Sequence, residues 1–451
     1  MTSRPPPPGL PAGEADSGSV SFGILGVAGP GGRDVAALAR PRPWLVRRLF
    51  PLIATAGLIA IGMITTTWGP LLVGRHAWGL PDDLWGTLVA AQRLIHLDLG
   101  GLYTQPTALI TLPGAAVILV PVVAVIEAAG LSLQVQSVHN PEPAAWLLAG
   151  PYEIALSAVA LFAADAIAEH LGVSRWKRAV LALSGAVALW NVSVRWGHPE
   201  DAVAVGLLLF AILALARGGR RRAAWLVGAA VAVQPLVLLA LPIVLALVPA
   251  RRLAGFLVRA AIPAALVLGA AATANWNDTV KAVTRQPNWP AIDHPTPWIS
   301  LAPRMSGGAV AAGTGRVLAI VVACGCAAVL WRRWRAARNR GEWSAGTLAE
   351  VVWWAAAALA LRSVFEPVMV AFYLWPTLAI ALIAASRSWP RLAATAVVTT
   401  TLTFVSQATW RGPWIWWAPM LAGLGLTLFL ARVRPAAPAR AAVRPLARDG
   451  E

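Results

Sequence analysis

Charged residues are scarce in this chain of 451 residues. They make up 13% of it, whereas soluble domains carry roughly 25%. This deficit excludes an ordinary soluble domain, and 58% of the residues are hydrophobic instead. A membrane-spanning helix needs about 20 mostly apolar residues, and many windows meet that requirement. The apolar runs are continuous rather than alternating, which excludes a transmembrane β-barrel.

Cysteine and the common catalytic motifs are also sparse or missing. The two cysteines, Cys324 and Cys326, lie in the apolar run VVACGCAAV. Their spacing does not match CxxC redox or zinc motifs, so we interpret them as small packing residues. No phosphate-cradling glycine loop, GxSxG or HExxH motif occurs, which argues against nucleotide-driven chemistry.

The formal net charge of +17 raises the question of nucleic acid binding. Most basic residues fall in the tails and in the loops that lie inside if the N-terminus is cytoplasmic. This asymmetry is the positive-inside rule of membrane proteins. We therefore expect basic residues to set the topology and to contact membrane lipids, and we expect no nucleic acid partner.

The hydropathy pattern predicts an all-α, polytopic integral membrane protein with about 10–13 transmembrane or re-entrant helices. We expect a disordered cytoplasmic tail at 1–48, a transmembrane domain at 49–431 and a basic cytoplasmic tail at 432–451. The first tail is rich in Pro and Gly and has no apolar signal-peptide region near Met1. The predicted spans are 52–73, 146–169, 179–194, 202–216, 255–274, 310–330, 346–361, 367–385, 392–409 and 413–430.

Two further apolar stretches do not fit as single spans. Residues 107–129 contain Pro113 and Pro121, and residues 224–248 are interrupted at Gln234-Pro235. We expect re-entrant pieces or pairs of short helices in both. Such breaks are tolerated only where they are buried in protein or line a cavity.

The longest external loops are predicted at 74–106 and 275–308, and we expect them to face each other over one cavity that holds Asp83. The second loop is rich in Trp and Pro. Its tryptophans have two interpretations, an interfacial aromatic belt or stacking on a sugar ring or lipid chain. They are Trp276, Trp289 and Trp298.

The adjacent carboxylates Asp82 and Asp83 are the first candidates for catalysis. Either could deprotonate an acceptor hydroxyl, provided that it lies within hydrogen-bond reach. The alternative is that the pair caps a helix over 84–97. The two interpretations are compatible, because one residue could cap while the other acts.

A second group of ionisable residues lies in WGHPEDA, at residues 196–202. His198, Glu200 and Asp201 could belong to a substrate site, begin a helix after Pro199, or hold a divalent metal. Arg362 and Glu366 could pair with each other, or Arg362 could bind a phosphate. Arg304, Arg195 and Lys281 are alternative phosphate ligands. Glu127 and Arg316 are ionisable groups at membrane depth.

These features together resemble the glycosyltransferase C superfamily. The resemblance rests on a span, an acidic external loop, "D…G-G-L-Y…P", a polar hairpin apex and the segment GAAVAVQPLVLLALP at 228–242. The nearest branch contains actinobacterial polyprenyl-phosphate-sugar-dependent mannosyl- and arabinofuranosyltransferases. The resemblance implies that Asp82 or Asp83 is catalytic and that Tyr103 belongs to the substrate site. Gln234 stands where the family often has Lys.

The resemblance implies a membrane glycosyltransferase that works at the outer face without a required cofactor. Its donor would be a polyprenyl-phosphate sugar, and its acceptor a lipid or a cell-envelope glycan. A lipid or glycan transporter or flippase is the rival interpretation, and a non-catalytic membrane scaffold of the same fold is a third. A transporter is less favoured because we find no internal repeat.

Overall fold

The computed structural model describes residues 44–68, 81–104, 109–133, 143–338, 343–408, 410 and 412–433. It is all-α and 77% helical. The chain divides into two compact units, Met1–Arg47 and Arg48–Glu451. In the first unit the short helix α1 spans Trp44–Arg47. Residues 1–43 of the predicted N-terminal tail and residues 434–451 lie outside the described residues.

Six helices are long and apolar enough to cross a membrane, which makes the chain a multi-pass membrane protein. Each coincides with a predicted span. Helices α7 and α8 together make one of them, and α2 continues into the π-helical turn η1 (Ile64–Trp68). The six are α2 (Leu49–Met63), α7 (Pro143–Ser157) with α8 (Val159–His170), α10 (Pro199–Ala216), α13 (Ala250–Ala274), α15 (Gly313–Arg338) and α16 (Ala345–Phe365).

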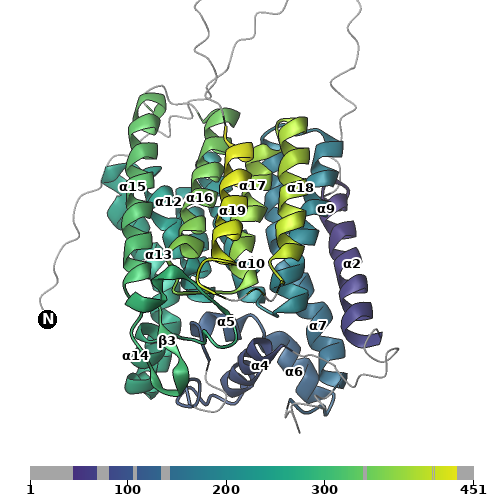
Figure 1. Ribbon diagram of the computed structural model, residues 1–451, viewed down its shortest axis with the longest axis vertical. Helices are drawn as coiled ribbons and strands as arrows, with labels where there is room; N and C mark the ends of the chain where they lie inside the picture. The colour runs from purple at the N-terminus through teal and green to yellow at the C-terminus, as the bar shows by residue number, and fades with distance from the viewer. Residues whose placement is uncertain are drawn as a thin grey trace, which may run out of the picture. The chain divides into compact units, whose positions relative to one another are not determined.

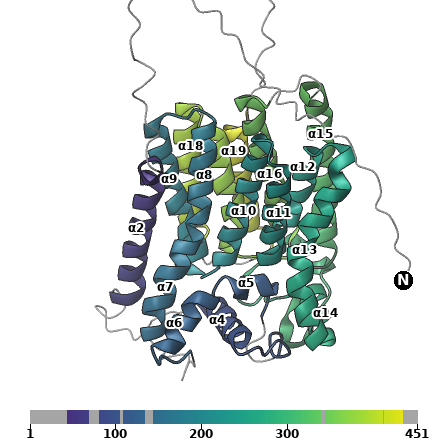
Figure 2. The ribbon, with the colours of Figure 1, turned by 180° about the vertical axis from the view of Figure 1, so that it is seen from behind.

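Shorter helices complete the bundle around α10, whose residues are almost all buried. In Figures 1 and 2, α2 lies along one edge of the bundle and α13 and α15 along the other. The remaining four predicted spans appear as these shorter helices and their flanking turns. They are α9 (Arg175–Trp190), η2 (Asn191–Arg195), η6 (Ala371–Leu374), α17 (Trp375–Ala385), α18 (Trp389–Val405) and α19 (Trp417–Ala431).

The two irregular apolar stretches are broken helices, as the prolines predict. The first contains α5 (Pro113–Val117) and α6 (Val120–Ala128). The second contains α11 (Arg220–Val233), the 3₁₀ turn η3 (Pro235–Leu239) and α12 (Leu241–Ala246), with Gln234 in an extended conformation between them. A Cβ added to Gly114 would lie 2.2 Å from the Ala232 carbonyl oxygen. Glycine therefore allows α5 to approach the end of α11 closely.

The two long predicted loops contain their own short elements. Helix α4 (Asp82–Ile95) lies in the first loop, and α14 (Trp276–Thr284) begins the second. These helices gather with α5 and α6 at one end of the bundle (Figure 1). The second loop also holds β1 (Pro287–Asn288), β2 (His294–Pro295), η4 (Pro297–Leu301) and η5 (Ser306–Gly308); β1 pairs with β3 (Val310–Ala311), and β2 pairs with β4 (Val368–Met369).

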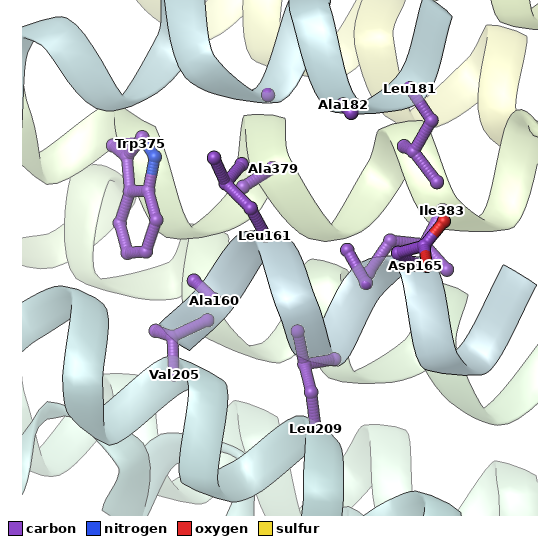
Figure 3. Close-up of a pocket in the computed structure, with 12 residues that line it drawn as sticks. Ala160, Leu161, Asp165, Leu181, Ala182, Val205, Leu209, Trp375, Ala379 and Ile383 are labelled. Carbon is purple, nitrogen blue, oxygen red and sulfur yellow. The ribbon is translucent and has the colours of Figure 1, made fainter. Parts of the chain in front are cut away.

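A buried ionic cluster connects α2, α8 and α9 near the first turn of α9. Asp165 accepts from Arg48 and from Arg178, each at 2.6 Å, and Arg48 also contacts Glu169 at 2.6 Å. Figure 3 shows Asp165 beside a void of about 20 Å³ that apolar side chains surround. The void has room for about one water molecule, so it is a packing gap and no substrate site.

Candidate functional site

A cavity of about 500 Å³ lies where the two long loops meet. The first loop contributes Asp83, and the second contributes residues 286–289, 292 and 293. The expectation that both loops share one cavity holding Asp83 is therefore confirmed. The other lining residues come from the segments before α4 and α5, from η2 and the first turn of α10, from the break after α11, from the last turn of α16 and from the segment around η6. They are Pro81, Ile110, Thr111, Arg195, Trp196, His198, Glu200, Gln234, Arg362, Val370, Phe372 and Tyr373.

His198 connects the two acidic groups that the sequence singled out. Its Nδ1 lies 2.7 Å from Glu200 Oε1, and its Nε2 lies 3.0 Å from Asp83 Oδ2. The imidazole stacks on the Phe372 ring at a centroid distance of 4.1 Å. Contacts at both ring nitrogens and stacking on one face thus hold the His198 ring in place. The contact with His198 in turn orients the Asp83 carboxylate in the cavity.

The backbone before α10 explains how His198 reaches this position. The π-helical turn η2 ends at Arg195, and Gly197 then adopts a left-handed conformation with φ of +64°. A Cβ at Gly197 would lie 2.8 Å from the Cβ of Leu84 in α4. Glycine is therefore required both by its dihedral angle and by the close approach of α4. Its small size lets His198 meet Asp83.

The positive charge of His198 and the negative charges of its carboxylate partners stabilise one another. Burial would lower the pKa of His198, but the carboxylates of Glu200 and Asp83 outweigh it and raise that pKa well above its ordinary value. Burial would raise the pKa of Asp83, but the hydrogen bond and charge of His198 outweigh it and lower that pKa. At neutral pH the site therefore holds an imidazolium between carboxylates, and Asp83 is ionised with 42% of its side chain exposed.

The acid pair stands at the start of α4, whose N-cap residue is Pro81. Asp83 Oδ2 accepts from His198. The side chain of Asp82 lies outside the described residues, so its role stays a prediction.

Asp201 and Arg362 form a second polar group beside the first. Gln234 Nε2 donates to Asp201 Oδ1 at 2.6 Å, and the guanidinium of Arg362 lies over the Tyr373 ring, 3.4 Å from its centroid. Arg362 Nη1 is 3.7 Å from Asp201 Oδ2. Among the described residues this nitrogen has no hydrogen-bond partner. The group therefore contains a buried cation with hydrogen-bonding capacity to spare.

A second cavity of about 360 Å³ adjoins the first and shares Thr111, Gln234, Gln286 and Arg362 with it. Its walls are mostly apolar and come from η3, α13, α14 and α15. Three of its lining side chains are among the exposed large hydrophobics of the chain: Leu238, Val283 and Ile320. The cavity therefore extends from the polar site toward the outer surface of the bundle.

Arg362 and Glu366 do not pair with each other, contrary to one of our interpretations. Glu366 accepts from Arg316 at 2.9 Å, and Arg316 also donates to Gln286. Arg316 and Glu366 line the apolar cavity. Arg362 therefore lies where the two cavities meet, whereas Arg316 lines the apolar cavity and contacts Gln286, which lines both.

Among the predicted site residues that the structure describes, Asp201, Tyr103 and Arg304 line neither cavity. The Tyr103 hydroxyl donates to the Thr111 carbonyl oxygen at 3.2 Å, so Tyr103 supports a lining residue from behind. Arg304 is exposed, and its backbone forms a bridge with Val310. The tryptophans also separate: Trp289 lines the polar cavity, Trp298 donates to the Val364 carbonyl oxygen, and Trp276 is exposed.

Sequence reasoning missed Asp293, Asn288, Phe372 and Tyr373, all of which line the polar cavity. Burial and the nearby charge of Asp83 raise the pKa of Asp293 to about 6. Its position in the Trp- and Pro-rich loop was the only available signal. Within the described part of the chain, no three His, Cys, Asp or Glu side chains gather as metal ligands.

No protein-family model matches the chain, and no curated protein matches it.

Proposed function

We propose that this chain is a membrane glycosyltransferase that moves a sugar from a polyprenyl-phosphate donor to a lipid or cell-envelope glycan acceptor. The observation that carries the proposal is the junction of an acidic polar cavity with an apolar one at Arg362. A lipid-linked sugar has the same three parts: a polar sugar, an anionic phosphate and an apolar chain.

Each part has a chemical counterpart in the site. The sugar and the acceptor hydroxyl would occupy the polar cavity, where the Asp83 carboxylate would serve as base or electrostatic partner for the hydroxyl. The donor phosphate would lie near Arg362, whose guanidinium has an unpartnered N–H and is well suited to phosphate. The lipid chain would occupy the apolar cavity. Stabilising the charge of the departing phosphate is the usual electrostatic contribution to such a step.

Gln234 bears on the resemblance to the glycosyltransferase C superfamily. The family often has Lys at this position, and here the amide donates to Asp201 instead. Arg362 and Arg316 line the same apolar cavity as Gln234. In our proposal these arginines supply the positive charge that the family obtains from Lys.

The proposal is tested with the purified full chain in proteoliposomes. The probes are farnesyl-phosphate-linked mannose and arabinofuranose with a radiolabelled sugar, offered with lipids extracted from the source membrane. We expect label to enter the lipid fraction. Asp83→Asn should reduce the rate about 10²- to 10⁴-fold, the usual contribution of such a group, because Asn keeps the size of Asp and loses its charge.

Asp278→Asn is the matched control, since Asp278 lines neither cavity, and we expect it to retain a near-normal rate. Asp82→Asn tests the neighbouring acid separately. Glycan and lipid profiles of a deletion strain would identify the natural product. Movement of the intact labelled lipid between leaflets without sugar transfer would contradict the proposal and favour a transporter. A wild-type rate in the Asp82/Asp83 double variant would favour a non-catalytic role for the pair.

A further inference from the structure

Asp293 lies in the polar cavity with Asp83, although the two residues come from different loops. It directly precedes β2, whose residues His294 and Pro295 pair with Met369 and Val368 of β4. The chain after β4 leads to Phe372, which stacks on His198. The same strand pairing thus connects Asp293 to the residues that support the Asp83–His198 pair.

The loop that carries Asp293 is anchored on both sides. Before the strand, the Asp293 N–H donates to the Trp289 carbonyl oxygen at 3.0 Å. The His294 ring stacks on Trp416 at 4.1 Å with an interplanar angle of 3°. After the strand, the buried Thr296 hydroxyl donates to the Glu366 carbonyl oxygen at 2.7 Å. Asp293 is therefore a fixed part of the cavity wall.

Asp83 and Asp293, two of the carboxyl groups that line this cavity, differ in proton affinity. Burial, and then the charge of Asp83, raise the pKa of Asp293 to about 6, while His198 acts in the opposite direction. Asp83 stays ionised because His198 donates to it. The charge of Asp293 also acts on the Tyr373 hydroxyl, which lines the same cavity. Two carboxyls whose environments separate their pKa values in this way commonly divide proton transfer and charge stabilisation between them.

We propose that Asp293 is the proton acceptor for the incoming hydroxyl and that Asp83, held by His198, is the fixed negative charge beside the reacting sugar. The inference rests on the proposed function and assigns the base within it. The acceptor O–H bond breaks, and its proton goes to the Asp293 carboxylate. The acceptor oxygen bonds to the anomeric carbon of the sugar. The bond from that carbon to the donor phosphate oxygen breaks, and its electron pair leaves with the polyprenyl phosphate. Asp293 then returns the proton to water.

The first experiment is the pH profile of sugar transfer in the proteoliposome assay. A base acts only when it is unprotonated, so the wild-type rate should fall as the pH is lowered through about 6. Asp293→Asn should lower the rate about 10²- to 10⁴-fold and abolish this acidic limb. Asp293→Glu should keep a measurable rate and an acidic limb. Asp278→Asn is the matched control, because Asp278 lies in the first turn of α14 in the same loop and does not line the cavity. It should behave as wild type.

The second experiment needs no substrate. Infrared difference spectra of the purified protein should show a protonated-carboxyl band that grows as the pH falls through about 6. The band should be absent in Asp293→Asn. In Asp83→Asn its midpoint should move to lower pH, because the charge that raises the pKa of Asp293 is removed.

The outcomes separate this inference from the proposed function. If wild type transfers sugar while Asp293→Asn keeps its rate and its acidic limb, only the assignment of Asp293 is overturned. A protonated-carboxyl band that persists in Asp293→Asn with an unchanged midpoint overturns the assignment of Asp293 as well. If wild type transfers no sugar from either probe, both proposals are overturned.

Discussion

At the scale of single residues, His198 determines the charge state of the site. It is buried, yet it contacts Asp83 and Glu200 by both ring nitrogens. An uncompensated cation in this position would be costly. The flanking carboxylates make the imidazolium favourable instead, and they raise the pKa of His198.

This raised pKa predicts a pH-dependent stability. The stabilisation by a group whose folded-state pKa is raised is fully present below its unfolded-state pKa, about 6.5 for His. It is lost as the pH rises through the higher folded-state pKa. His198→Gln should therefore lower the thermal unfolding temperature most near pH 6, and the difference from wild type should shrink at alkaline pH. The measurement is thermal unfolding in detergent across that range.

Phe372→Leu serves as the control for His198→Gln, because it removes ring stacking but no charge. Its difference from wild type should stay nearly constant with pH. A His198→Gln difference that stays constant or grows toward alkaline pH would show that His198 is neutral in the folded protein. Asp83 has a lowered pKa, so it also stabilises the fold but with the opposite pH dependence: its contribution is present above its unfolded-state pKa and is lost as the pH falls through the lower folded-state pKa.

At the scale of elements, two devices position the site. The break at Gln234 brings an amide to Asp201, and the close approach at Gly114 holds α5 against that break. Near the first turn of α9, the Arg48–Asp165–Arg178 cluster connects three helices. Since η2 and His198 follow α9 in the chain, the cluster anchors the helix that leads to the site.

We predict that Asp165→Asn is strongly destabilising. The change leaves two largely buried arginines without their shared carboxylate, and breaking a buried ion pair costs about 3–5 kcal/mol. The measurement is the free energy of unfolding in mixed micelles. Glu350→Gln is the control, because its partner Arg333 is 52% exposed, and exposed pairs contribute about 0–1 kcal/mol. Equal losses in both variants would contradict the idea that the cluster anchors these helices.

At the scale of the whole molecule, the distribution of basic residues predicts the topology. Arginine-rich segments lie at 217–222, between the end of α10 and the start of α11, and at 332–338, in the last turns of α15. Acidic groups line the cavity at the other end of these helices. The positive-inside rule places the arginine-rich segments in the cytoplasm. We therefore expect both termini inside and the cavity outside.

Reporter fusions test this topology. A phosphatase fused after residue 431 should be inactive in cells, because it stays in the cytoplasm, and one fused after residue 290 should be active outside. The reverse pattern would place the cavity on the cytoplasmic side. It would also exclude the outer-face transfer that we propose.

The sequence alone was sufficient for the all-α class, for the six long apolar helices and for the interrupted stretches. Hydropathy predicts them because lipid requires long apolar helices, and Pro113, Pro121 and Pro235 identify the breaks because proline disrupts helix hydrogen bonding. The acid pair and the polar turn at 196–202 were recognisable because ionisable groups are rare in such a chain. The shared cavity followed from the lengths of the two loops.

The partners of these groups were decided only by the tertiary structure. His198 meets Asp83 across 115 positions of sequence, Arg362 lies near Asp201 rather than pairing with Glu366, and Glu366 pairs with Arg316. Hydropathy does not encode such pairs, because they depend on which faces of the packed helices meet. The proton affinity of Asp293 likewise depends on its burial and on Asp83 across the cavity. These are properties of the folded arrangement, since an isolated loop would leave the same carboxyl in water.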